Sequence, residues 1–568
     1  MLTIFLCSNN NFVQAVKKTL LRYNFHNMKR LNYKDLITWV LVIICGFLFG
    51  QLILRSISKL TLSDFHVYYY VGKAVMKYGM HPYSNYTPIY PYYFPPASLL
   101  IFWPLTVVPF YLAKIIFTLI NSVLLFLSIF LINKMLVGKI DYRFWLMLIL
   151  SLIYYPLRFT FSDGQFNVVI LAVFTLGLYS FYKNKYLVGG ISLGLGIITK
   201  ISPAIIVLYG ILRKKVKLVV VAGITVIALS LLAENFVSKD INYYYAKFIV
   251  KDVSAQSKGL GTTDQSLLAF IKRFDHENEL EMNSTTKSII SYSVIAFLGI
   301  LFFIFDLIAK KGKYNLFIDY FILVTVGVIG TGLAWYHQYT TLILPLFGFG
   351  ILVLRHFNKK YKYIRLAYIL GLILVYFSWF IDVRSVSIFS DGYANFIMFY
   401  GGIVLLIGLY AIKINQKWLV EEHTPETTGF DRCWEVSLGL FFVSLIFGLN
   451  PLKLQEKLKE NRDESRVKAL DYMSGVLIKK DVSFKIEESN SFLLSNRVGK
   501  GYIRFGKGED TKVLDRMYIL YEDPINKSTY NYNFKSHTGE DFELRAKLES
   551  RKYIDIYGDY YLVDNTEN

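Results

Sequence analysis

The sequence predicts an all-α polytopic membrane protein with about 11–13 transmembrane helices and a small extracytoplasmic α/β domain at its C-terminus. Two observations predict this fold class. Hydrophobic residues make up 54% of the 568 residues and charged residues only 18%, whereas soluble domains carry about 25% charged residues. The apolar residues are also gathered into runs of about 20, the length at which a helix crosses a bilayer. Disordered and fibrous proteins are excluded by this composition.

The apolar runs define the candidate spans in chain order. They lie at roughly 36–54, 113–133, 143–161, 165–182, 216–233, 288–309, 314–333, 339–355, 366–382, 394–412 and 434–450. The stretch 186–212 is long enough for two short or broken helices around Lys200. The stretch 97–111 contains Pro104 and Pro109, so we expect a re-entrant or interfacial segment there.

Basic residues between the spans predict the orientation. Lysine and arginine concentrate in alternate short loops, as they do on the cytoplasmic side of membrane proteins. These loops contain Lys134 to Arg143, Lys183 to Lys185, Arg213 to Lys217, Lys310 to Lys313 and Arg355 to Arg365. Residues 1–35 are then a cytoplasmic N-terminal segment, and loops 55–96 and 234–287 face outward. The net charge of +20 is thereby assigned to loops of a multi-pass plasma (inner) membrane protein, and we expect membrane lipids and no nucleic acid as partners.

The tail, 451–568, has a different composition from the membrane domain, 36–450. It is charged and follows the last span on the outer side. Leu452 to Leu470 has the pattern of an amphipathic helix. Alternating residues at 482–487 and 553–563 predict half-buried strands. We therefore expect an extracytoplasmic soluble α/β domain.

The first outer loop, 55–96, contains the most informative polar residue. Asp64 comes shortly after a span and should lie near the membrane surface. The pattern from Tyr68 to Val75 suits a short amphipathic helix in the interface. Seven of the thirteen prolines lie between Pro82 and Pro109, so the loop should be stiff. Asp64 alone is equally explained as a helix N-cap.

Four other polar clusters fall on the same predicted side. They are Asp163 to Asn167, Lys200 to Pro203, Gly261 to Ser266 and Trp335 to Tyr339. Each has a structural alternative, because Asp-Gly is a turn signal, a lysine can snorkel from a helix end, and an aromatic-histidine segment suits a membrane interface. An ionisable residue at membrane depth nevertheless marks function more often than not. Asp319 lies inside a span away from this set, and we expect it to be structural.

Taken together, the motifs resemble the family-87 glycosyltransferases. The resemblance rests on Asp64, Tyr68, Gly79, Pro82-Tyr83 and Tyr93-Phe-Pro-Pro96, on Gly164 to Asn167, on Gly189-Gly, Gly194 and Lys200 to Pro203, on Asp264 to Ser266, and on Trp335 to Gln338 with Leu344-Pro345. It covers roughly residues 35–410. These relatives are polytopic GT-C enzymes that use polyprenyl-phosphate sugars, typically mannose.

The resemblance implies displacement at a sugar C1 by an acceptor hydroxyl, with polyprenyl phosphate leaving and the anomeric centre inverting. Such a reaction needs a base on the hydroxyl and cations on the phosphate. Asp64 is the implied catalytic base. The candidate donor phosphate-binding residues are Lys200, His337, Arg158 and Arg384. The candidate substrate-binding residues are Tyr68, Tyr83, Asp163, Gln165, Asn167, Asp264, Gln265 and Trp335. We expect no cofactor and no metal, because Asp64 alone is a weak site for a hard cation.

The expected substrates are a polyprenyl-phosphate sugar and a glycolipid or glycan acceptor on the outer face. The sequence leaves three alternatives open: a transporter or lipid flippase, a transferase of another GT-C class, and a non-enzymatic assembly or sensor protein. A transporter typically has repeats and polar residues at the midplane, whereas the polar clusters here gather at one face. A non-enzymatic protein would tolerate replacement of Asp64, Lys200 and His337.

Overall fold

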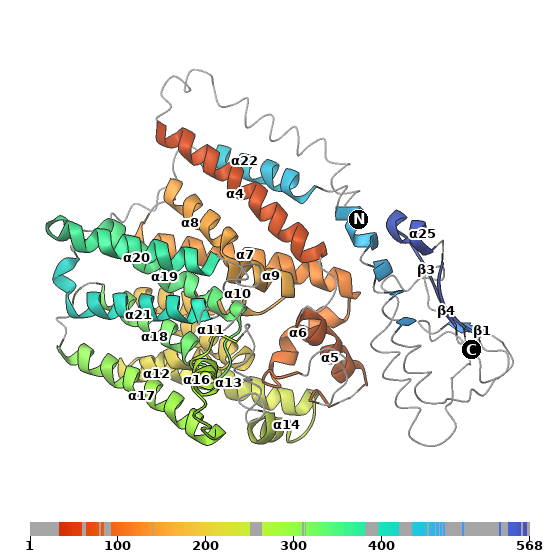
Figure 1. The fold of residues 1–568 in the computed structure, drawn as a ribbon, viewed down its shortest axis with the longest axis horizontal. Coiled ribbons are helices and arrows are strands. Elements are labelled where there is room, and N and C mark those ends of the chain that lie inside the picture. Colours follow the sequence, from red (N-terminus) through yellow and green to blue (C-terminus); the bar gives the residue numbers. More distant parts are fainter. Residues whose placement is uncertain are drawn as a thin grey trace.

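A computed structural model (Figure 1) shows a helical bundle followed by a small sheet. It describes residues 33–58, 64–78, 81–83, 92–138, 140–249, 264–308, 312, 314–380, 396–419 and 434–450, and in the tail 454–460, 462–464, 466–467, 470–471, 491–493, 533–535, 543–557 and 560–564.

The predicted bundle of apolar helices is confirmed. Among the described residues, seven helices are long and apolar enough to cross a membrane, or eight if a bent pair counts as one span; α10, α11 and α18 are apolar but shorter. The membrane-domain helices are α4 (Tyr33–Ser58), α7 (Phe110–Leu136), α8 (Tyr142–Ile153), α9 (Tyr155–Asp163), α10 (Asn167–Lys183), α11 (Tyr186–Thr199), α12 (Ala204–Leu212), α13 (Val216–Phe236), α17 (Ser284–Ile308), α18 (Asn315–Ile329), α19 (Ile343–His356), α20 (Lys362–Phe380), α21 (Ile397–Ile414) and α22 (Trp434–Leu449). The helices α10, α18 and α19 are buried over most of their length and form the core.

The expected span 143–161 is broken into α8 and α9, which meet at an angle of 62°. Tyr154 is extended (φ −63°, ψ 120°), and Pro156 follows in the first turn of α9. Proline is tolerated in a first helical turn but cannot donate the hydrogen bond that would continue α8. The bend directs the end of α9 toward the 3₁₀ helix η2 (Tyr336–Leu342), with which it is in contact.

Two short helices lie between α4 and α7. The first contains the helix expected from Tyr68 to Val75, and the second lies in the segment 97–111, for which we expected a re-entrant or interfacial piece. They are α5 (Asp64–Tyr78) and α6 (Ser98–Thr106). They pack against each other through stacked rings of Tyr68 and Phe102, whose centroids are 4.7 Å apart. The later outer segment contains α14 (Ile241–Tyr244), a π-helix η1 (Tyr245–Ile249) and α16 (Leu267–Glu277).

The helices α4 and α22, far apart in sequence, lie side by side (Figure 1). Gly46 and Gly50 share one face of α4, because residues four apart are neighbours on a helix. A methyl group on Gly50 would lie 2.7 Å from the backbone nitrogen of Leu449, and one on Gly46 would meet the backbone oxygen of Phe441 at 2.5 Å. Small residues permit this close backbone approach, which is a common basis of helix association in membranes.

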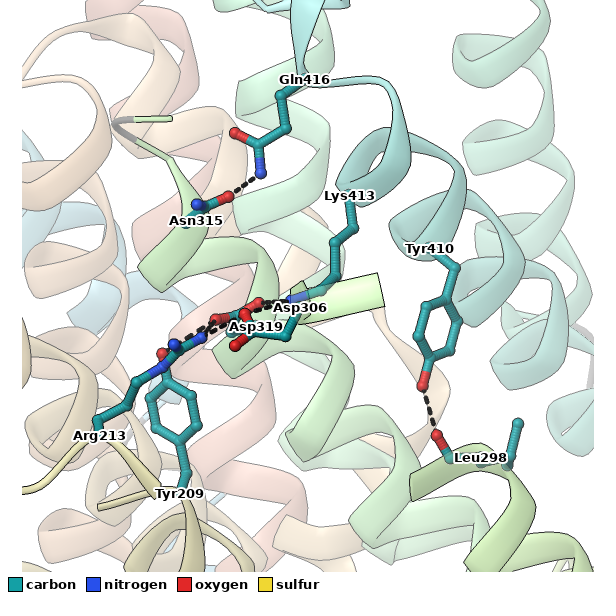
Figure 2. A network of polar contacts seen from close by, with 9 residues as sticks. All are labelled: Tyr209, Arg213, Leu298, Asp306, Asn315, Asp319, Tyr410, Lys413 and Gln416. Atoms are coloured by element: carbon teal, nitrogen blue, oxygen red, sulfur yellow. Dashed lines mark hydrogen bonds and ion pairs between the residues drawn. The ribbon is translucent and has the colours of Figure 1, made fainter. Parts of the chain in front are cut away.

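A network of four charges, of which Asp319 and Lys413 are buried, joins the C-terminal end of α12 to α17, α18 and α21 (Figure 2). Asp319 pairs with both Arg213 and Lys413. Asp306 accepts from Arg213 at 2.6 Å and from Lys413 at 3.2 Å. The Tyr209 hydroxyl adds a hydrogen bond of 3.1 Å to Asp319. The two acids and two bases balance, in agreement with the expected structural role of Asp319.

The tail contains an antiparallel sheet of order β1-β2-β3-β4, formed by β1 (Ser491–Leu493), β2 (Asn533–Lys535), β3 (Glu543–Lys547) and β4 (Tyr560–Asp564). The residues of the expected helix 452–470 that the structure describes are helical at 454–460 and 462–464. Residues 482–487 lie outside the described part of the chain.

The expected strand at 553–563 is wrong in its first half, which forms the helix α25 (Arg551–Tyr557). The sequence there alternates, but it also places Tyr553 and Tyr557 four residues apart, and their rings stack at 6.1 Å in the helix. The backbone oxygen of Ser550 accepts from the amides of Tyr553 and Ile554 and starts the helix. The segment therefore fits both the two-residue period of a strand and the 3.6-residue period of a helix, and the structure shows the helix.

The contact between α4 and α22 gives a stability prediction. Gly50→Leu should destabilise the protein by about 1–3 kcal/mol, because the added side chain forces the two backbones apart. Thermal unfolding in detergent, followed by tryptophan fluorescence, measures the change.

The matched control is Gly439→Leu on α22, because a side chain at Gly439 meets no atom within 4 Å. Equal unfolding midpoints for the two variants would contradict the packing role of Gly50.

Candidate functional site

The candidate residues gather where helices begin, end or break. Asp64 opens α5, and the turn from Asp163 to Asn167 joins α9 to α10. Lys200 lies in the break between α11 and α12, and His337 lies in η2. Non-helical backbone at membrane depth is tolerated only where it is buried in protein or lines a cavity.

The turn between α9 and α10 has a left-handed glycine at its centre. Gly164 has φ 69°, and its amide donates to the carbonyl of Thr160. A β-carbon on Gly164 would lie 2.5 Å from the β-carbon of Phe65. Only glycine combines this backbone angle with such a close approach. The turn therefore holds the first residues of α5 directly beside it.

Tyr68 connects α5 to this turn. Its hydroxyl donates to Gln165 Oε1 at 2.8 Å, and its ring packs against Phe94, Phe102 and Phe166 at centroid distances of 5.0, 4.7 and 4.7 Å. Burial raises the pKa of Tyr68, and the nearby carboxylates of Asp64 and Asp163 add to the rise. Both carboxylates therefore lie close enough to act on the same phenol.

Lys200 is held by the last residue of the same turn. Its Nζ donates to Asn167 Oδ1 at 3.0 Å, and the charge of Asp64 attracts it. Within the described part of the chain, no carboxylate approaches Lys200 to the 4.0 Å of an ion pair. The Lys200 side chain is thus held by an amide, with the carboxylate of Asp64 only nearby.

His337 lies near Lys200 and is buried, with 3% of its surface exposed. The charge of Lys200 acts on its ring. The imidazole stacks on Phe159 with 4° between the planes and meets Trp335 edge-on at 5.4 Å. Its Nδ1 and the amide nitrogen of Asn167 are buried without a hydrogen-bond partner among the described residues. Buried polar atoms of this kind point to a ligand or water.

Asp264 and Gln265 hold the segment that carries Trp335 and His337. Asp264 Oδ1 accepts from the amides of Ala334 and Ser266 at 3.0 and 3.1 Å. The amide of Gln265 donates to the carbonyl of Ala334 at 2.7 Å, and its carbonyl accepts from the Tyr339 hydroxyl. These contacts give both residues a positioning role.

The structure does not join every predicted residue to this group. Arg158 lies on α9 near Arg55, and no hydrogen bond or ion pair of the described residues links it to Lys200 or His337. Arg384 lies outside the described residues. Tyr83 stands further out, where its hydroxyl donates to the carbonyl of Phe94 at 2.8 Å.

Two threonines were missed by the sequence reasoning. Thr160 and Thr340 share a hydrogen bond of 2.7 Å, and Thr160 also donates to the carbonyl of His337 at 3.2 Å. They hold the end of α9 against η2. The signal available in the sequence was a single buried hydroxyl on each apolar segment, which is too common to single out.

The described part of the chain contains no group of three or more His, Cys, Asp or Glu residues placed to hold a metal ion. The absence of a metal from the reaction stays a prediction.

Comparison with known proteins shows which family part of the chain is similar to. Residues 92–332 match the model of glycosyltransferase family 87. The chain is also 26% identical over 199 residues to a Mycobacterium tuberculosis protein named polyprenol-phosphate-mannose-dependent alpha-(1-2)-phosphatidylinositol pentamannoside mannosyltransferase. That alignment covers 33% of this chain and 44% of the relative, so the chain spans less than half of the relative's length. No solved structure matches the chain.

The matched region contains Asp163, Gln165, Asn167, Lys200 and Asp264. Asp64 and His337 lie outside it, one on each side, and the fold brings both to the matched residues.

Proposed function

We propose that this chain, which over residues 92–332 belongs to glycosyltransferase family 87, is an integral-membrane enzyme that transfers a hexosyl group, mannose, from a polyprenyl-phosphate donor to a glycolipid or glycan acceptor. The family assignment supports glycosyl transfer. The mycobacterial relative is named as a polyprenol-phosphate-mannose-dependent mannosyltransferase, and this supports polyprenyl phosphate as the lipid of the donor and mannose as the sugar. The apolar helices support a multi-pass membrane protein.

One observation supports the catalytic roles more than any other. The carboxylate of Asp64 lies near the half-buried amine of Lys200, which has no ion-pair partner among the described residues. A base beside a cation is what inverting displacement from a phosphate requires. The acceptor oxygen attacks C1 of the sugar while Asp64 takes the hydroxyl proton. The bond from C1 to the phosphate oxygen breaks, and its electron pair leaves with the polyprenyl phosphate.

Lys200, the amide of Asn167 and His337 are the proposed ligands of the donor phosphate. Their side chains offer an ammonium group and two buried nitrogens that lack partners among the described residues. Phosphate oxygens accept hydrogen bonds from such donors, and the bonds strengthen as charge develops on the leaving group. Arg158 and Arg384 are weaker candidates for binding the phosphate. The described contacts do not bring Arg158 to Lys200, and Arg384 lies outside the described residues.

The remaining candidates surround this centre. The proposed contacts of the sugar are Tyr68, Asp163, Gln165 and Trp335. Asp264 and Gln265 hold the backbone of Ala334, which precedes Trp335. The basic loops support a site on the outer face of the plasma membrane, with a cytoplasmic N-terminus and the tail outside.

Asp64→Asn should lower the turnover number for sugar transfer by at least about 100-fold, because the amide cannot take the acceptor proton. Transfer from radiolabelled polyprenyl-phosphate mannose to a membrane-lipid extract measures the loss. Asp240→Asn is the matched control, since Asp240 is an exposed carboxylate of another outer segment. Near-normal turnover in Asp64→Asn, with a folded protein, would refute the assignment.

Lys200→Met should weaken donor binding by at least about tenfold, because methionine keeps the length of the side chain and removes the charge that meets the phosphate. The affinity for polyprenyl phosphate, measured by its protection against thermal unfolding, reports the effect without turnover. Lys239→Met, at an exposed lysine, should leave the affinity unchanged. Equal affinity in the Lys200 and Lys239 variants would contradict the phosphate role.

The reaction should proceed without a metal ion, because Lys200 and the neighbouring nitrogens supply the positive charge on the phosphate. Transfer rates measured with and without excess EDTA should agree within error. A loss of activity that Mg²⁺ or Mn²⁺ restores would overturn this proposal.

A further inference from the structure

Two outer segments far apart in sequence bring four ring side chains together beyond the proposed catalytic centre. His81 and Tyr83 come from the first outer loop, and Tyr244 and Tyr245 come from the junction of α14 and η1. The rings of Tyr83 and Tyr244 are stacked, with centroids 5.9 Å apart and 12° between the planes. His81 meets Tyr244 edge-on at 4.7 Å, and Tyr245 lies 5.8 Å from Tyr83. We call these four residues the aromatic shelf.

The aromatic shelf is fixed in place and yet open to solvent. The hydroxyl of Tyr83 donates to the carbonyl of Phe94, which immobilises its ring. Tyr244 keeps 37% of its surface exposed, and His81 and Tyr83 are half-buried. A rigid, partly exposed set of rings can bind a ligand without paying much side-chain entropy.

A row of rings runs from the aromatic shelf to the proposed catalytic centre. Tyr83 is 5.9 Å from Tyr92, Tyr92 is 5.7 Å from Phe94, and Phe94 is 5.0 Å from Tyr68. Tyr68 is bonded to Gln165 and lies beside Asp64. Tyr92 and Tyr68 are buried, so this row of packed rings fixes the position of the shelf relative to Asp64.

We propose that the aromatic shelf binds the sugar chain of the acceptor and holds it so that its terminal hydroxyl reaches Asp64. This inference rests on the proposed function and adds the acceptor subsite to it. The C–H groups on one face of a pyranose ring carry partial positive charge and pack on the negative face of an aromatic ring. The hydroxyls around the sugar edge need hydrogen-bonding partners at the same time.

The chemistry of the shelf favours a sugar over an acyl chain. All four side chains combine an aromatic face with a polar edge, three phenols and one imidazole, and none is aliphatic. Burial lowers the pKa of His81, which favours the neutral imidazole, a group that can both donate and accept a hydrogen bond. An acyl chain would offer no hydrogen bond to the exposed edge of Tyr244.

Mannopentaose, a soluble sugar chain without lipid, is the probe for the test. Its dissociation constant for the full-length protein in detergent, measured by saturation-transfer NMR, should rise about tenfold in Tyr244→Ala. Tyr244→Phe keeps the ring and should bind within about twofold of the wild type. In the transfer assay, Tyr244→Ala should raise the acceptor KM and leave kcat and the donor KM unchanged.

Tyr243→Ala is the matched control. Tyr243 neighbours Tyr244 and is more exposed, at 61%, but its ring faces Lys247 instead of the shelf. Mannopentaose should bind this variant as it binds the wild type. Equal weakening in Tyr243→Ala and Tyr244→Ala would mean that the tyrosines anchor the protein at the membrane interface, and would overturn the proposal. So would failure of the wild type to bind mannopentaose, or unchanged binding in Tyr244→Ala.

The binding measurement uses no donor, so it separates this inference from the proposed function. If the protein binds mannopentaose through Tyr244 but transfers no mannose, the role of the shelf is supported and the proposed reaction is refuted. If the protein transfers mannose but binds mannopentaose equally well without the Tyr244 ring, the proposed reaction is supported and the role of the shelf is refuted.

Discussion

The cost of burying charge among apolar helices determines how this protein is organised. A charge taken out of water must be paired or hydrogen-bonded. At one end of the bundle, Arg213, Lys413, Asp306 and Asp319 neutralise one another, and four helices are joined with no charge left over. In the candidate functional site, Lys200 has an amide as its hydrogen-bonding partner and a carboxylate only nearby. The first cluster needs no further group, whereas we propose that the second binds the phosphate of the donor.

The same constraint explains why the candidate functional site lies where helices break. In a membrane protein, backbone N–H and C=O groups must find their hydrogen-bonding partners within the protein. At each helix break, nearby protein groups therefore bond to the backbone groups that the helix leaves free. The turn at Gly164 bonds back to Thr160, and the segment before η2 bonds to Asp264 and Gln265. Polar side chains needed to complete these breaks are thereby concentrated in one region. The side chains of Lys200 and His337 do not bond to the backbone at these breaks, and they are the ones proposed to bind the donor phosphate.

Much of this arrangement could be predicted because it follows from length, hydropathy and charge. Apolar runs fixed the helices to within a few residues, and the polar interruptions marked the breaks at Asp163 and Lys200. Features that depend on a partner far away in sequence could not be predicted. The close contact of Gly50 with α22 needs residue 449, and the support of His337 needs the hydroxyl of Thr160. In the tail, α25 formed where the pattern at Tyr553 and Tyr557 fitted two periods.

The surplus of aromatic residues, 17% of the chain, has a consequence for how the two proposed substrates would meet. In the proposed reaction a polyprenyl-phosphate donor approaches from the bilayer, and its phosphate would meet groups such as Lys200. The proposed sugar acceptor is hydrated and would lose water as it approaches Asp64. The stacked rings of Tyr244 and Tyr83, which have polar edges, could replace part of that water on one face of a sugar. Because ring packing makes this surface rigid, it would hold an acceptor hydroxyl in place for a single carboxylate, the proposed base Asp64.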